Sequence, residues 1–195
     1  MNIGVSHPVC APYKETGTTV TYDPGWVMGS AISISPSPET YDEPFYADNT
    51  EYLRDKGTSG GTITEEITGM KPQKYAQLMG HTYEEGDGGF ESPERVRISK
   101  DDSPISVGHG YIVSTVEKIN GQRKESFMVV WFNKVIFGEP NDAEASTKTE
   151  SIEYSTLSLE GAYSADITGA IGEKTYFEKY ESAMAYLDHI AGITE

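Results

Sequence analysis

The sequence has very few of the residues that build metal centres and disulfides. It contains one cysteine, Cys10, and four histidines among 195 residues. A single cysteine excludes an internal disulfide and a cysteine-based metal cluster. The histidines, His7, His81, His109 and His189, share no metal-ligand spacing with one another or with the cysteine. We therefore expect no metal and no cofactor, and interpret Cys10 as a small residue near a flexible end.

Long apolar runs are also missing. No stretch approaches the roughly 20 apolar residues that a bilayer span requires. The first residues lack the charged and apolar halves of a signal peptide. The sequence therefore predicts a protein that is made and kept in the cytoplasm or released by lysis, without a membrane partner.

Basic residues are scarce relative to acidic ones. The chain has 15 Lys and Arg against 31 Asp and Glu, a formal net charge of −16. Each contact with a nucleic-acid phosphate needs a cation, so specific nucleic-acid binding is disfavoured. The acidity fits two interpretations: simple solubility, or a surface that lies near DNA without binding it.

Sequence motifs of common enzymes are absent as well. No Gly-x-Ser-x-Gly elbow occurs. The glycine-rich segment 86–89 lacks both the lysine of a phosphate-binding loop and the repeated oxygen ligands of a calcium loop. Glu65 and Glu66 are neighbours in a predicted strand, so they point to opposite faces and cannot flank one glycosidic bond. We expect a protein that is not an enzyme.

What the sequence does contain favours β structure. Thirteen Tyr and six Phe suit pleated, half-buried surfaces, and the length suits a single domain over residues 1–195. Strands are predicted at 31–35, 62–68, 95–98, 111–119, 127–137, 151–159 and 175–180, and helices at 72–79 and 182–191. Gly80 is expected to end the first helix in a left-handed cap, and Ser182 to be the N-cap of the second.

Two of these strand predictions carry detail. Strand 62–68 alternates, with Ile63, Glu65 and Ile67 on one face. The pair Asn120-Gly121 lies between strands 111–119 and 127–137 and predicts a tight hairpin. Because residues 128–132 are apolar on both faces, we expect the second of these strands to be central in its sheet and covered on each side. Pro36 and Pro38 are expected to end the ladder of the first strand.

A polar stretch of unusual length, residues 39–61, separates the first two predicted strands. It carries Tyr41, Phe45, Tyr46, Tyr52 and Leu53 among acidic residues and ends in a glycine-rich run. Loops this long without regular structure are uncommon inside domains and are usually functional. Since such a loop cannot bury its own aromatic side chains, we expect these five residues to contact a partner.

Several segments occur in the same order as in one protein family. They are Ser35-Pro36-Ser37-Pro38-Glu39-Thr40, Phe45-Tyr46-Ala47-Asp48-Asn49, Leu78-Met79-Gly80-His81-Thr82, Val130-Trp131-Phe132-Asn133-Lys134-Val135 with Glu139-Pro140 after it, and Thr147-Lys148-Thr149-Glu150-Ser151-Ile152-Glu153-Tyr154 leading to Leu159-Glu160-Gly161. This ordered set resembles the major tail tube proteins of long-tailed, siphovirus-type bacteriophages of Gram-positive hosts. The resemblance covers residues 31–163. Residues 1–30 are interpreted as an N-terminal arm and 164–195 as a C-terminal extension.

The resemblance implies a mainly β (β + α) fold, a two-sheet β-sandwich or partly closed barrel with one flanking helix and a C-terminal helix. It implies hexameric rings of identical subunits that stack into a tail tube, through which double-stranded DNA passes without specific binding. The implied partners are copies of the chain itself, a tape measure protein and a tail terminator. The implied location is the tail of the virion, assembled in the host cytoplasm.

Residue roles follow from combining this resemblance with the residues. Residues 39–61 would form a long assembly loop that buries Phe45, Tyr46, Tyr52 and Leu53 against the adjacent ring and offers Arg54 and Lys56 to a neighbour's carboxylates; the full candidate set also includes Tyr41. Of Glu65 and Glu66, at most one would face the channel. Sheet edges would be covered by neighbours in the ring.

Three alternatives remain open at this level. One is a monomeric β-sandwich module that binds carbohydrate or a receptor through its tyrosine-rich loop. Another is a small acidic hydrolase whose carboxylates converge only in space. The third is the secretion-tube protein of a contractile injection system, which is similar to the tail tube proteins.

Overall fold

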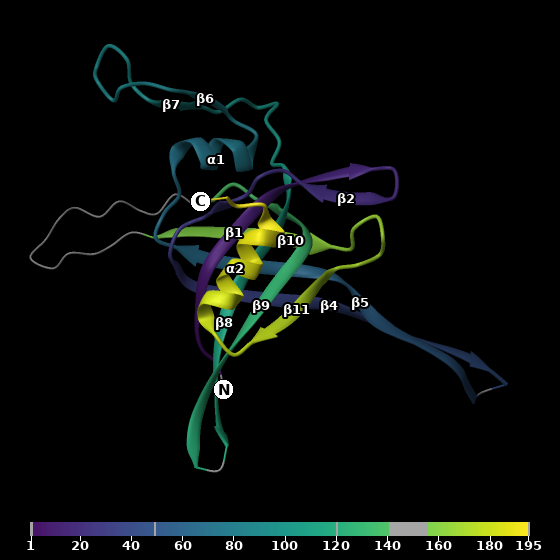
Figure 1. The fold of residues 1–195 in the computed structure, drawn as a ribbon. Helices are drawn as coiled ribbons and strands as arrows, with labels where there is room; N and C mark the ends of the chain where they lie inside the picture. The colour runs from purple at the N-terminus through teal and green to yellow at the C-terminus, as the bar shows by residue number, and fades with distance from the viewer. Residues whose placement is uncertain (1, 49, 120, 141–155, 195) are drawn as a thin grey trace, which may run out of the picture.

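The computed structural model describes residues 2–48, 50–119, 121–140 and 156–194 (Figure 1). The strands are β1 Asn2–Thr16, β2 Thr19–Tyr22, β3 Trp26–Val27, β4 Ala31–Ala47, β5 Thr50–Ile67, β6 Thr82–Glu84, β7 Arg95–Arg97, β8 Ser106–Ile119, β9 Gln122–Phe137, β10 Leu157–Ser164 and β11 Gly172–Phe177. The helices are α1 Pro72–Met79 and α2 Tyr180–Ala191. The expected mainly β class with a flanking and a C-terminal helix is confirmed.

One large antiparallel sheet dominates the molecule. Its strand order is β2-β1-β8-β9-β10-β5-β4, with β3 added to β1 and β11 added to β9, while β6 and β7 form a small second sheet. Because β1 also approaches β4, the large sheet is curled. In the part of the chain that the structure describes, the ladder between these two strands is not formed, so the barrel does not close.

The N-terminal residues belong to the body of the sheet, so the interpretation of 1–30 as an arm was wrong. β1 pairs along β8, and Val9, Cys10 and Ala11 are fully buried. Cys10 is therefore a core residue and not part of a flexible end. The register shifts between Ser6 and Val9, where His7 has a positive φ of 54°. This bulge breaks the period-two pattern that identifies a strand in a sequence.

The predicted hairpin of β8 and β9 is confirmed, although Asn120 of its turn lies outside the described residues. β9 is central, as expected: β8 pairs with one edge, while β10 and β11 share the other. Its apolar residues cover both faces of the sheet. Val130 and Phe132 enter the core inside the curl, and Val129 and Trp131 enter a second core beneath α2.

The C-terminal residues also complete the body, which corrects their interpretation as an extension. β11 pairs with β9 over 127–132, and α2 lies across the outer face of the sheet (Figure 1). Ala183, Leu187 and Ala191 of α2 are fully buried against it. The helix begins two residues earlier than predicted, and its N-cap is Lys179, not Ser182.

The first helix agrees with its prediction. α1 begins at Pro72 and ends at Met79, and Gly80 after it has a φ of 73°, the expected left-handed cap. Leu78 and Met79 are buried in the core inside the curl, so α1 covers one end of it. The strand predicted at 95–98 is β7, and its partner β6 was not predicted. Of the strand predicted at 151–159, residues 151–155 lie outside the described part of the chain.

The long polar stretch 39–61 is not an irregular loop but most of a β-hairpin. β4 and β5 pair continuously from Ala31 and Ile67 out to Ala47 and Thr50. Pro36 and Pro38 do not end this ladder, because β4 is an edge strand. On an edge, the missing N–H of a proline can face away from the neighbouring strand without loss of a ladder bond.

Candidate assembly surface

The hairpin projects beyond the sheet as a two-stranded arm. β10 pairs with β5 only as far as Gly60, so residues 40–59 pair only with one another; we call them the hairpin arm. Glycines allow close packing at its base. A Cβ at Gly61 would collide with the carbonyl oxygen of Ser37 and the ring of Tyr163. In Figure 1 the arm extends well away from the body.

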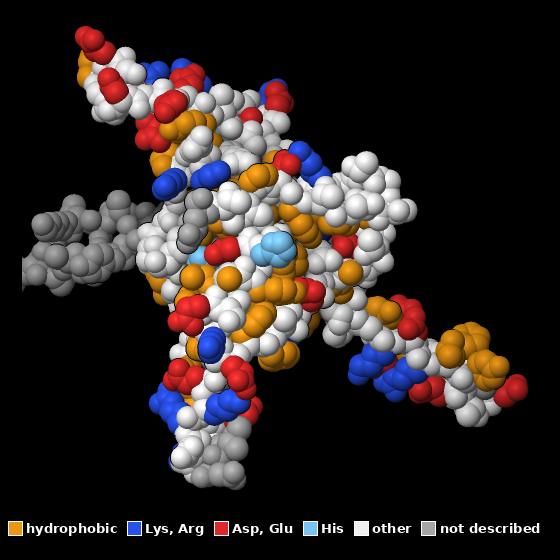
Figure 2. Space-filling view, in the orientation of Figure 1, with side chains coloured by type: hydrophobic (Ala, Val, Ile, Leu, Met, Phe, Trp, Pro, Cys, Tyr) orange, Lys and Arg blue, Asp and Glu red, His pale blue; other side chains and the backbone are white. Residues whose placement is uncertain are grey.

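The hairpin arm exposes all five apolar residues predicted to contact a partner. Tyr52 is 78% exposed, and Tyr41, Phe45, Tyr46 and Leu53 are exposed too. Phe45 lies opposite Leu53 in the ladder, and its ring contacts that of Tyr52 edge to face with 6.4 Å between centroids. Figure 2 shows hydrophobic side chains on the arm with charged side chains beside them. The structure thus gathers these residues on one narrow projection.

The basic residues of the arm contact an acidic side chain within it. The Arg54 and Lys56 side chains nevertheless stay 53% and 69% exposed, so their contact with a neighbour's carboxylates stays a prediction. Arg54 donates two hydrogen bonds to the Asp42 carboxylate, Nε to Oδ1 at 2.6 Å and Nη2 to Oδ2 at 2.9 Å. Lys56 lies 3.7 Å from the same carboxylate. The bidentate contact with Arg54 lowers the pKa of Asp42 and raises that of Arg54. This pairing fixes the side chains on one face of the arm.

The predicted channel-facing pair is separated by the sheet. Ile63, Glu65 and Ile67 share the inner face as predicted, and the Glu65 side chain is fully buried. Glu65 therefore cannot line a channel, and its assignment as a candidate was wrong. Glu66 is on the outer face, partly exposed, and accepts a hydrogen bond of 2.5 Å from Thr156 Oγ1. Only Glu66 remains a candidate.

Glu65 instead forms a buried pair with His109. The carboxylate Oε2 lies 3.6 Å from His109 Nε2, and both side chains are 0% exposed. Nδ1 of the ring lies 3.0 Å from the carbonyl oxygen of Val9. Because a carbonyl oxygen can only accept, Nδ1 carries the hydrogen atom and donates the hydrogen bond. Burial raises the pKa of Glu65 to about 8. Burial also lowers the pKa of His109 to about 4, although the Val9 carbonyl opposes this shift. At neutral pH both groups are largely uncharged.

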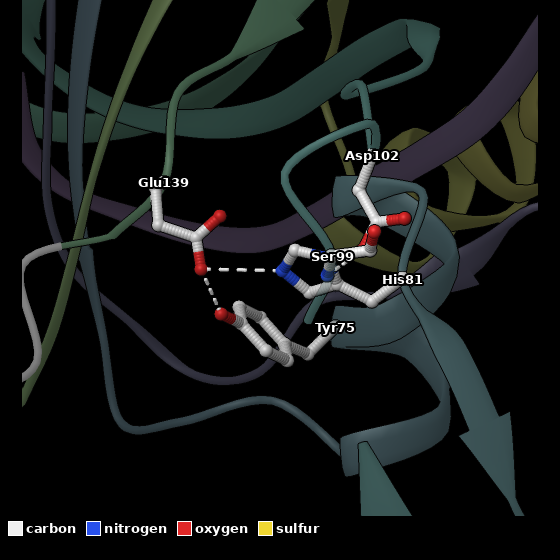
Figure 3. Close-up of polar contacts among 5 residues, drawn as sticks. All are labelled: Tyr75, His81, Ser99, Asp102 and Glu139. Carbon is white, nitrogen blue, oxygen red and sulfur yellow. Dashed lines mark hydrogen bonds and ion pairs between the residues drawn. The ribbon is translucent and has the colours of Figure 1, made fainter. Parts of the chain in front are cut away.

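A second histidine joins three segments at the end of the molecule that carries α1 (Figure 3). His81 Nδ1 lies 2.8 Å from Asp102 Oδ2, and Nε2 lies 3.3 Å from Glu139 Oε1. Tyr75 donates a hydrogen bond to the same Glu139 oxygen, and the Ser99 N–H donates to Asp102. Both ring nitrogens contact carboxylates, so neither is placed to activate a nucleophile. The cluster fastens α1 and the loop before β8 to the end of β9.

The His81 cluster makes the local stability of this end of the molecule depend on pH. Burial disfavours the imidazolium, but hydrogen bonds to Asp102 and Glu139 outweigh burial and raise the pKa of His81. A raised folded-state pKa means that the stabilisation is complete below the ordinary value of 6.5 and is lost as pH rises through the folded value. We expect hydrogen-exchange protection factors of α1, β6 and β7 to fall over that range.

The matched variants are His81→Phe and His189→Phe. His81→Phe keeps a ring beside Tyr75 but removes both ionic contacts, so protection at pH 6 should be lower and its pH dependence should disappear. His189 lies exposed on α2, so His189→Phe should leave the protection at pH 6 and its pH dependence unaltered. If protection in wild type and in His81→Phe depended on pH equally, the proposed role of the His81 cluster would be wrong.

Among the described residues, no group of three or more His, Cys, Asp or Glu side chains could hold a metal ion. None of the described helices is long and apolar enough to cross a membrane. The His81 cluster could not be found from the sequence, because its members come from separate segments with no common spacing.

Compared with known proteins, the chain matches no family model and no curated protein. The resemblance to tail tube proteins therefore depends on the ordered segments of the sequence. One of these segments, 147–154, lies wholly outside the described residues.

Proposed function

We propose that this protein is a structural subunit of a phage tail tube, with hexameric rings that stack into a conduit for DNA. The observation that carries the proposal is the hairpin arm, which holds five exposed apolar side chains away from its own body. Contiguous apolar surface on a projection favours a protein contact. A contact between the arm of one copy and the body of the next does not close on itself, so it repeats into a filament.

The edges of the sheet support lateral contacts within a ring. β2 and β4 lie at the two ends of the strand order. Edge strands present unpaired backbone groups that favour a neighbouring chain unless something covers them. In a ring, each edge would be covered by the adjacent subunit.

The charge of the chain supports a DNA conduit over a DNA-binding protein. A hexamer of chains with formal net charge −16 would carry a net charge of about −96. Carboxylates along the channel would repel passing phosphates and prevent adhesion to the wall. Glu66, on the outer face of β5, is the remaining candidate of the predicted pair. The tape measure protein and tail terminator, the virion location and the absence of enzymatic activity are part of the same proposal.

Negative-stain electron microscopy of the purified protein over a concentration series tests this function. The expected result is rings, then tubes of uniform diameter, as concentration rises. Monodisperse monomers at every concentration would overturn the proposal. Glycan-array binding by such monomers, lost when Tyr52 is changed, would favour the carbohydrate-binding alternative.

A further inference from the structure

An apolar groove opens between the first residues of β1 and the start of β4. Its volume is about 590 Å³, within the range of roughly 300–1,000 Å³ that is typical of binding pockets. The exposed side chains of Ile3 and Ile32 form its rim. Its floor comes from the inner face of the sheet and includes Val130, Phe132 and Tyr163. The groove is the open side of the curled sheet.

The chain's own arm cannot fill this groove. Pro36 lines the groove and belongs to the same continuous strand as Phe45. At about 3.3 Å per residue, the nine steps between them span roughly 30 Å. Folding the tip back would break the ladder between β4 and β5, so an arm in the groove has to come from another copy.

The wall of the groove indicates how an occupant is held. Pro36 and Pro38 lie on the free edge of β4 and have no N–H to donate. Addition of a strand at Pro36 and Pro38 is therefore disfavoured, so pairing with a ring neighbour would use other residues of β4. An occupant would be held mainly through side chains, as an aromatic hairpin tip can be.

Charge complementarity favours the arm as occupant. Lys174 is the one Lys or Arg among the side chains that line the groove. It forms no ion pair with another described residue within 4 Å. Residues 40–59 contain five acids and two bases, and both bases contact Asp42. Glu43, Asp48 and Asp55 are thus acids for which no cationic partner is seen in the described arm.

We propose that the hairpin arm of one copy docks in the groove between β1 and β4 of the next copy, with its aromatic side chains on the apolar floor and an acidic side chain near Lys174. This inference depends on the proposed function and specifies the receiving surface of its filament contact. It also explains why the core inside the curl is left open on this side.

Site-specific disulfide trapping tests the contact. Thr50→Cys places a thiol on the arm and Ser33→Cys places one in the groove lining, and both positions are exposed and polar. The native Cys10 is fully buried, so wild type is the background control. Ser182→Cys on α2 is the matched off-groove position. The two single variants are mixed, assembled and mildly oxidised, and linked peptides are identified by mass spectrometry.

Linkage of Thr50→Cys to Ser33→Cys in assembled material, without linkage to Ser182→Cys, is the expected result. Tubes that form while Thr50→Cys links elsewhere would overturn the groove assignment and leave the tube function intact. Failure of wild type and variants alike to assemble would overturn both proposals.

Filling the groove gives an independent measurement. A Cβ at Gly4, in the groove lining, would meet no atom within 4 Å, so Gly4→Phe can occupy the groove without a clash at its root. We expect an unchanged unfolding midpoint and a concentration threshold for assembly raised by about tenfold or more, with Gly4→Ala behaving as wild type. Unchanged assembly of Gly4→Phe would overturn the proposal. The proposal would also be overturned if native mass spectrometry showed an apolar small molecule bound to wild-type monomers and absent from Gly4→Phe, because the groove would then hold a ligand and not the arm.

Discussion

Changing Phe45 and Leu53 together to serine is expected to raise the protein concentration needed for tube growth by about 100-fold or more. Both side chains are largely exposed in the subunit and face each other across the hairpin arm. Burying one such side chain at an interface contributes about 1.5–3 kcal/mol, and about 1.4 kcal/mol corresponds to a factor of ten. Two side chains therefore account for at least about two orders of magnitude. Sedimentation of assemblies across a concentration series measures the threshold.

The control removes apolar surface of the same kind elsewhere. Ile98 and Ile167 are 67% and 48% exposed outside the arm, and their joint change to serine should leave the threshold unaltered. Free energies of unfolding should stay within about 0.5 kcal/mol in both double variants, because the substituted side chains are on the surface. Equal thresholds for the arm variant and wild type would rule out the arm as an assembly element.

A complete removal of the arm is also possible without disturbing the body. Thr40 and Thr58 are opposite each other in the ladder, so an Asn-Gly turn can join them in place of residues 41–57. This variant should stay folded and form no tubes at any concentration, because it keeps the sheet edges but lacks the contact between rings.

The second large effect concerns the buried Glu65–His109 pair. This pair should make the free energy of unfolding decrease both above and below a middle range of pH in which it is constant. Burial raises the pKa of Glu65 from 4.5 to about 8 and lowers that of His109 from 6.5 to about 4. Between pH 6.5 and 8 the folded state keeps the Glu65 proton that the unfolded state has lost. Stability therefore falls as pH rises. At about 1.4 kcal/mol per pH unit, the expected loss over this range is about 2 kcal/mol.

The same pair has no net pH dependence between pH 4.5 and 6.5. There, unfolding releases one proton from Glu65 and takes one up at His109, so the two contributions cancel. Between pH 4.5 and about 4 the unfolded histidine binds a proton that the folded one does not, so stability decreases as pH decreases over this short interval. Urea unfolding at a series of pH values should therefore give a free energy of unfolding that is constant between pH 4.5 and 6.5 and lower on either side.

Two variants separate the contributions of Glu65 and His109 to this pH dependence of stability. Glu65→Gln keeps the shape of the side chain but cannot ionise, so the decline above pH 6.5 should be smaller by about 2 kcal/mol than in wild type. His109→Phe keeps a ring beside Phe137 and Tyr111 and removes the opposing contribution, so a decline should extend from pH 4.5 upward. Identical profiles for wild type and Glu65→Gln would show that Glu65 does not hold its proton in the folded state.

The regular parts of this fold were readable from the sequence because local signals agreed with packing. In β5 the alternation of Ile63, Glu65 and Ile67 correctly gave the inner face, and it already placed a carboxyl group among apolar residues. In α1, Pro72 and Gly80 marked the start and the end. The apolar run at 128–132 correctly indicated a strand covered on both sides.

The remaining parts were missed where long-range pairing overrides local pattern. β1 contains Pro8 and a bulge after Ser6, so neither period nor propensity identifies it. Its longest ladder is with β8, which is distant in sequence. The hairpin arm looked like a loop because its apolar residues, such as Phe45 and Tyr46, are sequence neighbours and do not alternate with polar ones. Its signal lay in cross-strand symmetry: Asp42 lies opposite Lys56 and Phe45 opposite Leu53 about a turn at Asp48, whose φ of 50° an aspartate tolerates.

The pairing of β1 with β8 has a consequence for synthesis of the chain. Val9 lies opposite Gly110, so the first strand waits for a partner made about 100 residues later. At roughly 5–20 residues per second, that delay is on the order of 5–20 s on the ribosome. The arm needs only its own two neighbouring strands and can form much sooner. A nascent chain can therefore display the exposed apolar side chains of its arm before its body is complete, and association of such arms during translation is a hazard that this topology creates.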